Sequence, residues 1–179
     1  MSNRVLVTYA TRAGSTGEVA AILGEVLNAR GFAVDVKPIQ DNPVLAGYQA
    51  VLIGSAVRMG QWLPEAVDYL KTHQQALNAM PVALFTVHMN NLGEDEESEK
   101  NRNSYLDAVR PLVNPVAEAF FAGKMDFARL SFLDRLIARL VKAPEQDLRD
   151  WNKVRAWAEE VEPMLGPTQK GGSDGSQAS

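Results

Sequence analysis

The stretch that decides the fold is Thr8-Tyr9-Ala10-Thr11-Arg12-Ala13-Gly14-Ser15-Thr16-Gly17. It follows a short apolar run at residues 5–7 and precedes apolar residues at helical spacing, namely Val19, Ile22, Leu23, Val26 and Leu27. The order is therefore a strand, a loop rich in hydroxyls and glycine, and a helix. Such a loop gathers N–H groups and hydroxyls before a helix N-terminus, where the positive end of the helix dipole favours a phosphate.

The same stretch has a plainer interpretation as a helix cap. Ser15-Thr16-Gly17-Glu18 matches the Ser-x-x-Glu capping box, in which the serine hydroxyl is used inside the helix. We favour the phosphate interpretation, because Thr11, Ser15 and Thr16 together supply more hydroxyls than one cap requires.

Length and composition predict one ordinary soluble domain with a sizeable core. The chain has 179 residues, of which 46% are hydrophobic, and we expect a domain over 1–165 and a disordered tail of Gly, Ser, Gln and Lys over 166–179. A formal net charge of -4 argues against general nucleic-acid binding. The absence of cysteine excludes thiolate chemistry and disulfides, and His73 and His88 are too few for a histidine-rich metal site. Without a long apolar segment or leader pattern, we expect a cytoplasmic protein.

Strand and helix patterns alternate along the chain. Strands are expected at residues 33–36, 50–54, 82–87 and 116–122, and helices at 16–30, 64–77, 104–113 and 150–165. An acidic stretch, residues 93–100, is interpreted as a solvated loop. This alternation predicts a three-layer α/β sandwich with a five-stranded parallel sheet of order 2-1-3-4-5 and helices on both faces.

In that topology three loops meet beyond the carboxyl ends of the strands, at residues 11–16, 55–62 and 88–92. A cofactor with one phosphate and one large flat ring would use all three. Met59 and Trp62 offer apolar contact or stacking, and backbone groups near Ser55, Ala56 and Asn90 could hydrogen-bond the ring's polar edge. Arg12 and Arg58 are equally interpretable as partners of an anion and as ordinary surface arginines.

Rival nucleotide and catalytic folds fail specific tests. The chain lacks Gly-x-Gly-x-x-Gly after its first strand, the Gly-x-x-x-x-Gly-Lys-Ser/Thr loop, and the Gly-x-Ser-x-Gly nucleophile elbow. A phosphorelay receiver needs acidic residues after its first strand and an aspartate after its third, where this chain has Thr8-Tyr9 and Gly54-Ser55. His88, at the end of a strand, suits a proton donor near a ring, but we favour a hydrogen-bonded scaffold role.

A late segment, residues 128–143, is expected to form an extra amphipathic helix. Its apolar band contains Leu130, Phe132, Leu133, Leu136, Ile137, Leu140 and Val141, and its basic residues are Arg129, Arg135, Arg139 and Lys142. Two interpretations stay open. The helix lies on a membrane surface or covers an apolar substrate, or it packs on the sheet edge like any amphipathic helix.

The ordered series of motifs resembles the flavodoxin family. Thr11–Thr16 stands where that family has its FMN phosphate loop. Gly54–Gly60, Asn78–Pro81, Asn103–Tyr105, Ala122-Gly123 and Asp150-Trp151 extend the likeness from Arg4 to about Val161. Within the family, the series is most similar to the menaquinone-dependent protoporphyrinogen IX dehydrogenases of bacteria.

The resemblance implies a flavodoxin-like domain with one bound FMN, which oxidises protoporphyrinogen IX to protoporphyrin IX in heme biosynthesis and delivers electrons to a quinone. The resemblance implies that the FMN phosphate is bound by Thr11, Arg12, Ala13, Gly14, Ser15 and Thr16. It gives the isoalloxazine to Ser55, Ala56, Val57, Arg58, Met59, Gly60, His88, Met89, Asn90, Asn91 and Leu92, and assigns no catalytic residue and no metal. The alternatives are a one-electron carrier that docks on redox partner proteins and a flavin-free binding domain. Peripheral contact with the inner face of the membrane would come through residues 128–143.

Overall fold

A computed structural model describes residues 2–125, 136 and 146–168. Five parallel strands form its sheet in the order β2-β1-β3-β5-β6, with bounds β1 Arg4–Ala10, β2 Ala33–Pro38, β3 Ala50–Arg58, β5 Val82–His88 and β6 Ala117–Ala122. The predicted order 2-1-3-4-5 is therefore confirmed, because the additional strand β4 (Gln61–Trp62) only folds back antiparallel on β3. A separate antiparallel pair joins β7 (Lys124–Met125) to β8 (Gln146–Asp147).

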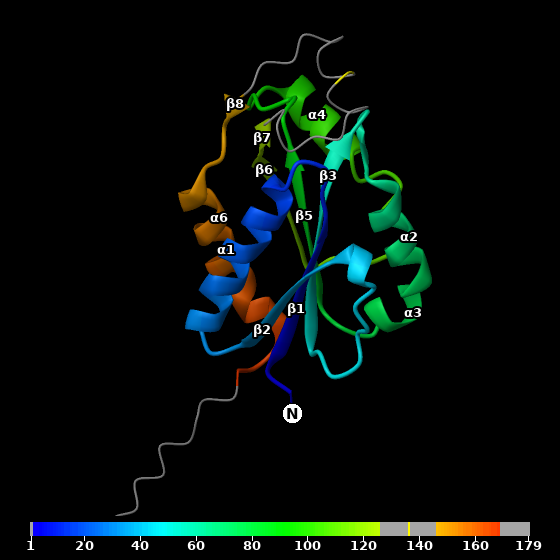
Figure 1. The fold of residues 1–179 in the computed structure, drawn as a ribbon, viewed down its shortest axis with the longest axis vertical. Helices are drawn as coiled ribbons and strands as arrows, with labels where there is room; N and C mark the ends of the chain where they lie inside the picture. Colours follow the sequence, from blue (N-terminus) through cyan, green and yellow to red (C-terminus); the bar gives the residue numbers. More distant parts are fainter. Residues whose placement is uncertain (1, 126–135, 137–145, 169–179) are drawn as a thin grey trace, which may run out of the picture.

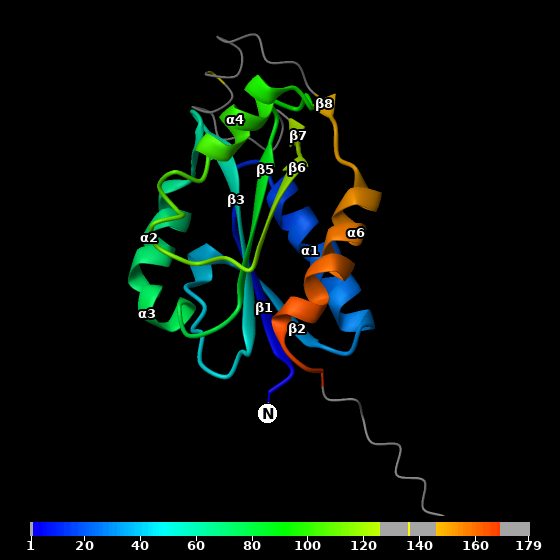
Figure 2. The ribbon, with the colours of Figure 1, turned by 180° about the vertical axis from the view of Figure 1, so that it is seen from behind.

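Helices cover both faces of the sheet (Figures 1 and 2). α1 (Ser15–Ala29) and α6 (Trp151–Val161) lie on one face, and α2 (Pro64–Thr72) and α3 (Gln74–Leu77) lie on the other. α4 (Glu96–Ser104) lies at the end where the parallel strands finish. Short 3-10 turns, η1 (Ile39–Asp41) and η3 (Glu162–Leu165), complete the described elements.

Alternation along the strands builds two cores. Val5, Val7, Leu52 and Phe85 point toward α1 and α6, whereas Leu6, Val51, Ile53 and Leu84 point toward α2 and α3. In the centre of the sheet the backbone of Gly54 lies against the ring of Phe85. A Cβ built on Gly54 would lie 2.0 Å from that ring, so a side chain there would clash. The two cores hold the strand ends in fixed register, and those ends carry the loops of interest.

The prediction of a helix at residues 104–113 is wrong. The helix lies earlier, as α4, and residues 105–112 form successive turns. Asp95 begins α4 by accepting a hydrogen bond from the Ser98 N–H at 2.9 Å, which an acidic loop prediction overlooked. Pro111 lacks an N–H and disfavours a regular helix there. The apolar side chains are nevertheless buried as expected, with Leu106 and Val109 at 0% exposure.

Two other helices end differently from their prediction. The helix expected at 64–77 is interrupted at His73, whose φ and ψ of -104° and 13° separate α2 from α3. The helix expected at 150–165 begins after the cap Asp150 and tightens into η3, where Pro163 cannot donate to the preceding turn. The acidic stretch 93–100 is helical from Glu96, although no residue of α4 is buried in the described structure.

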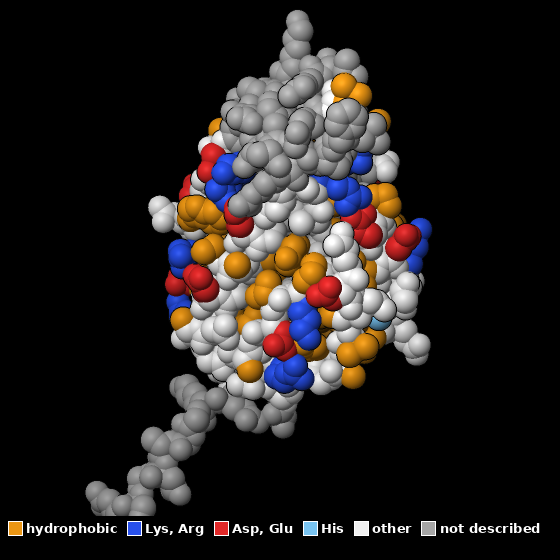
Figure 3. Space-filling view, in the orientation of Figure 1, with side chains coloured by type: hydrophobic (Ala, Val, Ile, Leu, Met, Phe, Trp, Pro, Cys, Tyr) orange, Lys and Arg blue, Asp and Glu red, His pale blue; other side chains and the backbone are white. Residues whose placement is uncertain are grey.

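The predicted late helix at 128–143 and most of the tail at 166–179 lie outside the described residues. Within the described part of the chain, none of the helices has the length and apolar character needed to cross a bilayer. On the face seen in Figure 3, hydrophobic side chains gather around the middle, with acidic and basic side chains together below them.

Candidate functional site

The first loop delivers unused hydrogen-bond donors at the N-terminus of α1. Gly14 adopts a left-handed conformation with φ 87°, and its N–H donates to the Thr11 Oγ1 at 2.9 Å. Gly14 is the N-cap, and no side chain of the described residues caps the helix. The capping box that Ser15 and Glu18 would form is therefore not made, which leaves the Ser15 hydroxyl outside such a role.

This helix end fits an anion. The N–H groups of Ser15, Thr16 and Gly17 belong to the first turn, where no intrahelical carbonyl reaches them. The Thr16 Oγ1 is buried and has no hydrogen-bond partner among the described residues. A buried hydroxyl without a partner is costly, and a phosphate oxygen would remove that cost.

Arg12 anchors the same loop to the rest of the fold. Its guanidinium binds the Glu65 carboxylate of α2 through Nη1–Oε1 and through Nη2–Oε2, the latter at 3.0 Å. The hydrogen bond from Arg12 is the main cause that holds the pKa of Glu65 below its usual value. The Arg12 charge is thus already engaged by a carboxylate beside the helix N-terminus.

The second loop, predicted over residues 55–62, is a β-hairpin in the structure, because β3 pairs with β4 across it. β3 continues to Arg58, which pairs with Gln61, and the turn between them is Met59-Gly60 with φ 53° and 77°. Two positive φ values are typical of the tight hairpin turns that match strand twist. The turn leaves the Met59 side chain 92% exposed, so it projects an apolar group from the hairpin tip.

Two residues of this hairpin act as scaffold. The Ser55 Oγ accepts from the Leu63 N–H at 3.0 Å and donates to the Ala56 carbonyl at 2.8 Å. Trp62 is 3% exposed, and its Nε1–H donates to the Thr86 Oγ1 at 2.9 Å. The prediction that Trp62 stacks on a ring is therefore wrong, because its indole is committed to the core below the hairpin.

His88 begins the third loop as a buried, neutral imidazole. Its Nδ1 lies 2.7 Å from the Asn90 carbonyl oxygen, an acceptor, so the proton sits on Nδ1. Burial is the largest cause that lowers the pKa of His88, and the charges of Arg102 and Lys153 lower it further, against the opposing bond to Asn90. The bond to Asn90 supports the scaffold interpretation.

The rest of the third loop is held from α4 and the turns after it. Arg102 donates to the carbonyls of Asn91 and Gly93 at 2.6 and 2.5 Å. The Asn91 Nδ2 donates to the Tyr105 hydroxyl at 2.7 Å, while Asn91 itself has a φ of 58°. The loop is therefore fixed by polar contacts rather than by burial of apolar groups.

The three loops enclose a cavity of about 330 Å³. Its walls contain most residues that the sequence predicted, namely Thr11, Arg12, Ala13, Ser15, Ala56, Val57, Met59, Gly60, His88, Met89, Asn90 and Asn91. Gly14, Thr16, Ser55, Arg58 and Leu92 were also predicted but do not line it.

Sequence reasoning missed three residues of the cavity wall, which are Val87, Tyr105 and Gly123. Gly123 follows β6, the neighbour of β5, so the strand order could have found it. A Cβ on Gly123 would lie 2.8 Å from Val87 and 3.3 Å from the Ser15 Oγ, so a side chain there would narrow the space between the first and third loops.

A doubly wound sheet whose first helix N-terminus suits a phosphate, beside a ring-sized cavity at the switch point, defines a flavodoxin-like domain. Residues 6–152 match the family model described as the Flavodoxin domain. The chain therefore belongs to the flavodoxin domain family, which implies a flavin cofactor.

Relatives and solved structures agree with this assignment. An Escherichia coli (strain K12) protein named protoporphyrinogen IX dehydrogenase [quinone] is 29% identical over 173 residues, covering 88% of this chain and 94% of that protein. A Leishmania major protein of the same name is 28% identical over 175 residues, covering 88% and 74%.

Among solved structures, oxidised flavodoxin 1 from Bacillus cereus has a TM-score of 0.60 at 13% identity, covering 91% of this chain and 99% of that one. Oxidised flavodoxin 2 from the same species has a TM-score of 0.58 at 19% identity, covering 90% and 99%. At these identities the structures support the fold alone.

Proposed function

We propose that the chain binds FMN, with the phosphate at the N-terminus of α1. The donors would be the N–H groups of the first helical turn and the hydroxyls of Thr11, Ser15 and Thr16. The fit rests on the Thr16 Oγ1, which has no partner among the described residues, and on the first-turn N–H groups, which gather at the same point. Arg12 would position the loop through its ion pair with Glu65.

The isoalloxazine would lie in the cavity of about 330 Å³ between the hairpin tip and the third loop. Met59 and Met89 offer adaptable apolar contact, and backbone groups of residues 56–60 and 88–91 offer hydrogen bonds. When bound, the flavin supplies the electron transfer, while the protein positions the ring and limits its contact with water. The neutral His88 holds the Asn90 carbonyl, and hence the loop, in place.

The reaction we propose is oxidation of protoporphyrinogen IX to protoporphyrin IX, a step of heme biosynthesis, with a quinone such as menaquinone as electron acceptor. Two relatives from distant organisms bear that one name, and each aligns with 88% of this chain. The observation that carries the proposal is the Thr16 Oγ1 without a described partner at the N-terminus of α1, where the neighbouring Thr11 and Ser15 line a cavity of about 330 Å³, in a chain with these relatives.

The test begins with the visible spectrum of the purified protein before and after FMN titration. We expect a flavin spectrum with stoichiometric binding. Under anaerobic conditions protoporphyrinogen IX is expected to bleach the flavin, and menaquinone to restore its absorbance. Bleaching no faster than free FMN in buffer would remove the porphyrinogen assignment, and a protein that never takes up FMN would remove the cofactor.

The second candidate function is a one-electron carrier. α4 presents Glu96, Glu97 and Glu99 in its first turn on an exposed helix, which suits docking to a basic partner protein. Potentiometry of the FMN-loaded protein separates the candidates. Two widely separated one-electron potentials favour the carrier, whereas a single two-electron step favours the dehydrogenase.

A further inference from the structure

A second, larger cavity of about 670 Å³ runs along β6, the last strand in the described sheet order. β6 forms its floor, and within the described residues β6 pairs only with β5, so the other edge is open. One side is the face of α6 that carries Lys153, Ala156 and Trp157. Figure 2 shows β6 with α6 to its right. We call this cavity the edge groove.

The edge groove is apolar along its base. Phe121 packs edge-on against Trp157 with ring centroids 5.7 Å apart. Phe120 packs edge-on against the His88 ring with ring centroids 6.1 Å apart. Leu92 and Leu148, each 40% exposed, also line it. Its volume lies within the range of sites that bind small organic ligands, which are mostly apolar with few polar groups.

The charges around the edge groove disfavour an anionic ligand. Four carboxylate side chains line it, those of Glu94, Glu118, Asp150 and Glu160, against two cationic ones, Arg102 and Lys153. A porphyrinogen carries carboxylates and would meet this acidic rim, although Arg110 neutralises Glu118 at 2.8 Å. A neutral, flat and apolar molecule meets no such repulsion.

One donor in the groove is available to such a molecule. The Lys153 ammonium has no hydrogen-bond or ion-pair partner among the described residues, whereas Arg102 is occupied by two backbone carbonyls. Lys153 is close enough to His88 to lower the pKa of that imidazole by its charge. Lys153 also belongs to the first turn of α6, and it lines the groove together with His88, which pairs with Ala122 at the end of β6.

That end adjoins the flavin cavity. His88 lines both cavities, so one buried side chain forms part of the wall that they share. A molecule bound at this end would be separated from a flavin by about the thickness of one residue, while its remainder followed the apolar base between β6 and α6.

We propose that the edge groove binds the quinone acceptor, with the quinone ring beside His88 and the isoprenoid chain along β6 and α6. Lys153 donates a hydrogen bond to a quinone carbonyl. This inference rests on the proposed function, because it names the place where the acceptor of that reaction binds.

The decisive variant is Ala156→Trp, which fills the groove from an exposed helical position. Binding of menadione and of a short-chain menaquinone to the oxidised FMN-loaded protein is measured by equilibrium dialysis. We expect affinity to fall at least about tenfold, which corresponds to about 1.4 kcal/mol. The matched control is Ala21→Trp, on an exposed position of α1 that lines neither cavity, and it should bind like wild type.

A second pair of variants tests the donor. Lys153→Met should weaken quinone binding severalfold, and Arg155→Met, two residues along the same helix and outside the groove, should not. Thermal unfolding and FMN affinity are measured for every variant and should match wild type. If the quinone affinity measured by dialysis is the same as that of wild type in both Ala156→Trp and Lys153→Met, the groove assignment is overturned.

The two proposals fail in different ways. If menaquinone does not reoxidise the reduced wild-type flavin above a buffer control, the quinone-linked function fails. If wild type is reoxidised and binds quinone, but Ala156→Trp does both equally well, only the location in the edge groove is wrong.

Discussion

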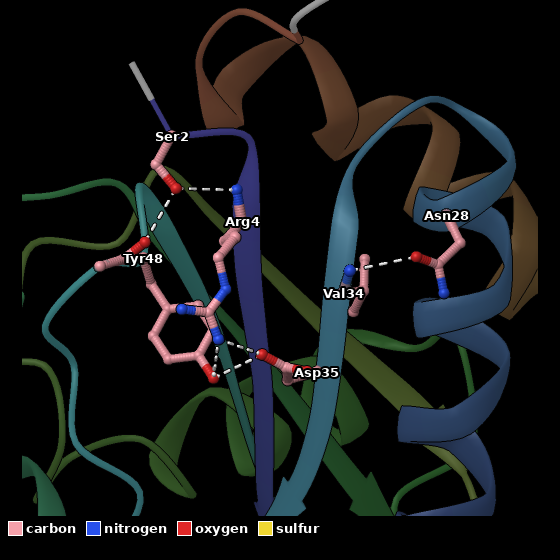
Figure 4. A network of polar contacts seen from close by, with 7 residues as sticks. Ser2, Arg4, Asn28, Val34, Asp35 and Tyr48 are labelled. Carbon is pink, nitrogen blue, oxygen red and sulfur yellow. Dashed lines mark hydrogen bonds and ion pairs between the residues drawn. The ribbon is translucent and has the colours of Figure 1, made fainter.

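The two ends of the sheet treat their polar groups in opposite ways. At the N-terminal end Asp35 accepts from both Arg4 and the Tyr48 hydroxyl at 2.7 Å, and the Arg4 guanidinium lies over the Tyr48 ring (Figure 4). At the carboxyl end the buried Thr16 Oγ1 has no partner among the described residues.

Backbone strain follows the same division. Of the three non-glycine residues with positive φ in the described structure, Met59 and Asn91 line the flavin cavity. Such conformations are disfavoured for residues with side chains and persist where the surroundings impose them. One end of the sheet is therefore built for stability, and the other keeps donors and strained turns ready for a ligand.

Thr16→Val should break this contrast most strongly. It removes the unpaired hydroxyl at nearly constant volume, so we expect FMN affinity to fall about tenfold to a hundredfold, from the loss of a hydrogen bond to a charged group. The free energy of unfolding of the variant apoprotein should equal or slightly exceed that of the wild-type apoprotein, because a buried hydroxyl without a partner has been removed. Flavin fluorescence titration and urea unfolding measure the two quantities.

Thr8→Val is the matched control for that variant. The Thr8 Oγ1 is also buried without a described partner, but it lies within β1, whereas Thr16 lies in the first turn of α1. Its affinity for FMN should equal that of wild type. A Thr16→Val protein with wild-type affinity would contradict the phosphate assignment.

Tyr48→Phe should produce the opposite pattern at the other end. The ring is 8% exposed and stays packed, but its hydroxyl no longer donates to Asp35. We expect the free energy of unfolding to fall by about 1 kcal/mol, with FMN affinity unchanged. Urea unfolding of the apoprotein and flavin titration provide the measurement, and any loss of flavin affinity would mean that the two ends are coupled.

His88→Gln should sharpen the comparison through pH. The folded-state pKa of His88 is lowered by burial, so the unfolded chain binds a proton that the folded one resists. Wild-type stability should therefore decline as pH falls through the usual histidine value of about 6.5, and the variant should lose part of that decline. Unfolding free energies between about pH 7.5 and about pH 5 give the test. If the unfolding free energies of wild type and variant fell in parallel with pH, the titrating group would not be His88.

Asp35→Asn should give the smallest effect, in a different pH range. Donation from Tyr48, followed by that from Arg4, lowers the folded pKa of Asp35 below 3.8. Its stabilising contribution is therefore present above that value and is lost as pH falls through the lowered pKa. Because the carboxylate is 38% exposed, the contribution is modest. The wild type and the variant should converge in stability under acid, as followed by circular dichroism.

The sequence by itself determined the architecture and the first loop. Alternating strand and helix patterns predicted the parallel sheet order, and Gly14 with its neighbouring hydroxyls marked the helix N-terminus, because these features are local and repeat with the period of each element. It misplaced α4, since apolar spacing at residues 106–113 suggested a helix where Pro111 favours turns.

Only the tertiary structure decided which side chains at the candidate site remain available to a ligand. The commitment of Trp62 to Thr86, the pairing of Arg12 with Glu65, and the entry of Tyr105 and Gly123 into the cavity wall join residues far apart in the chain. Sequence spacing carries no signal for such pairs, because they are fixed by how strands and helices pack across the sheet. The place of β6 at the end of the described strand order likewise emerges only once that order is complete.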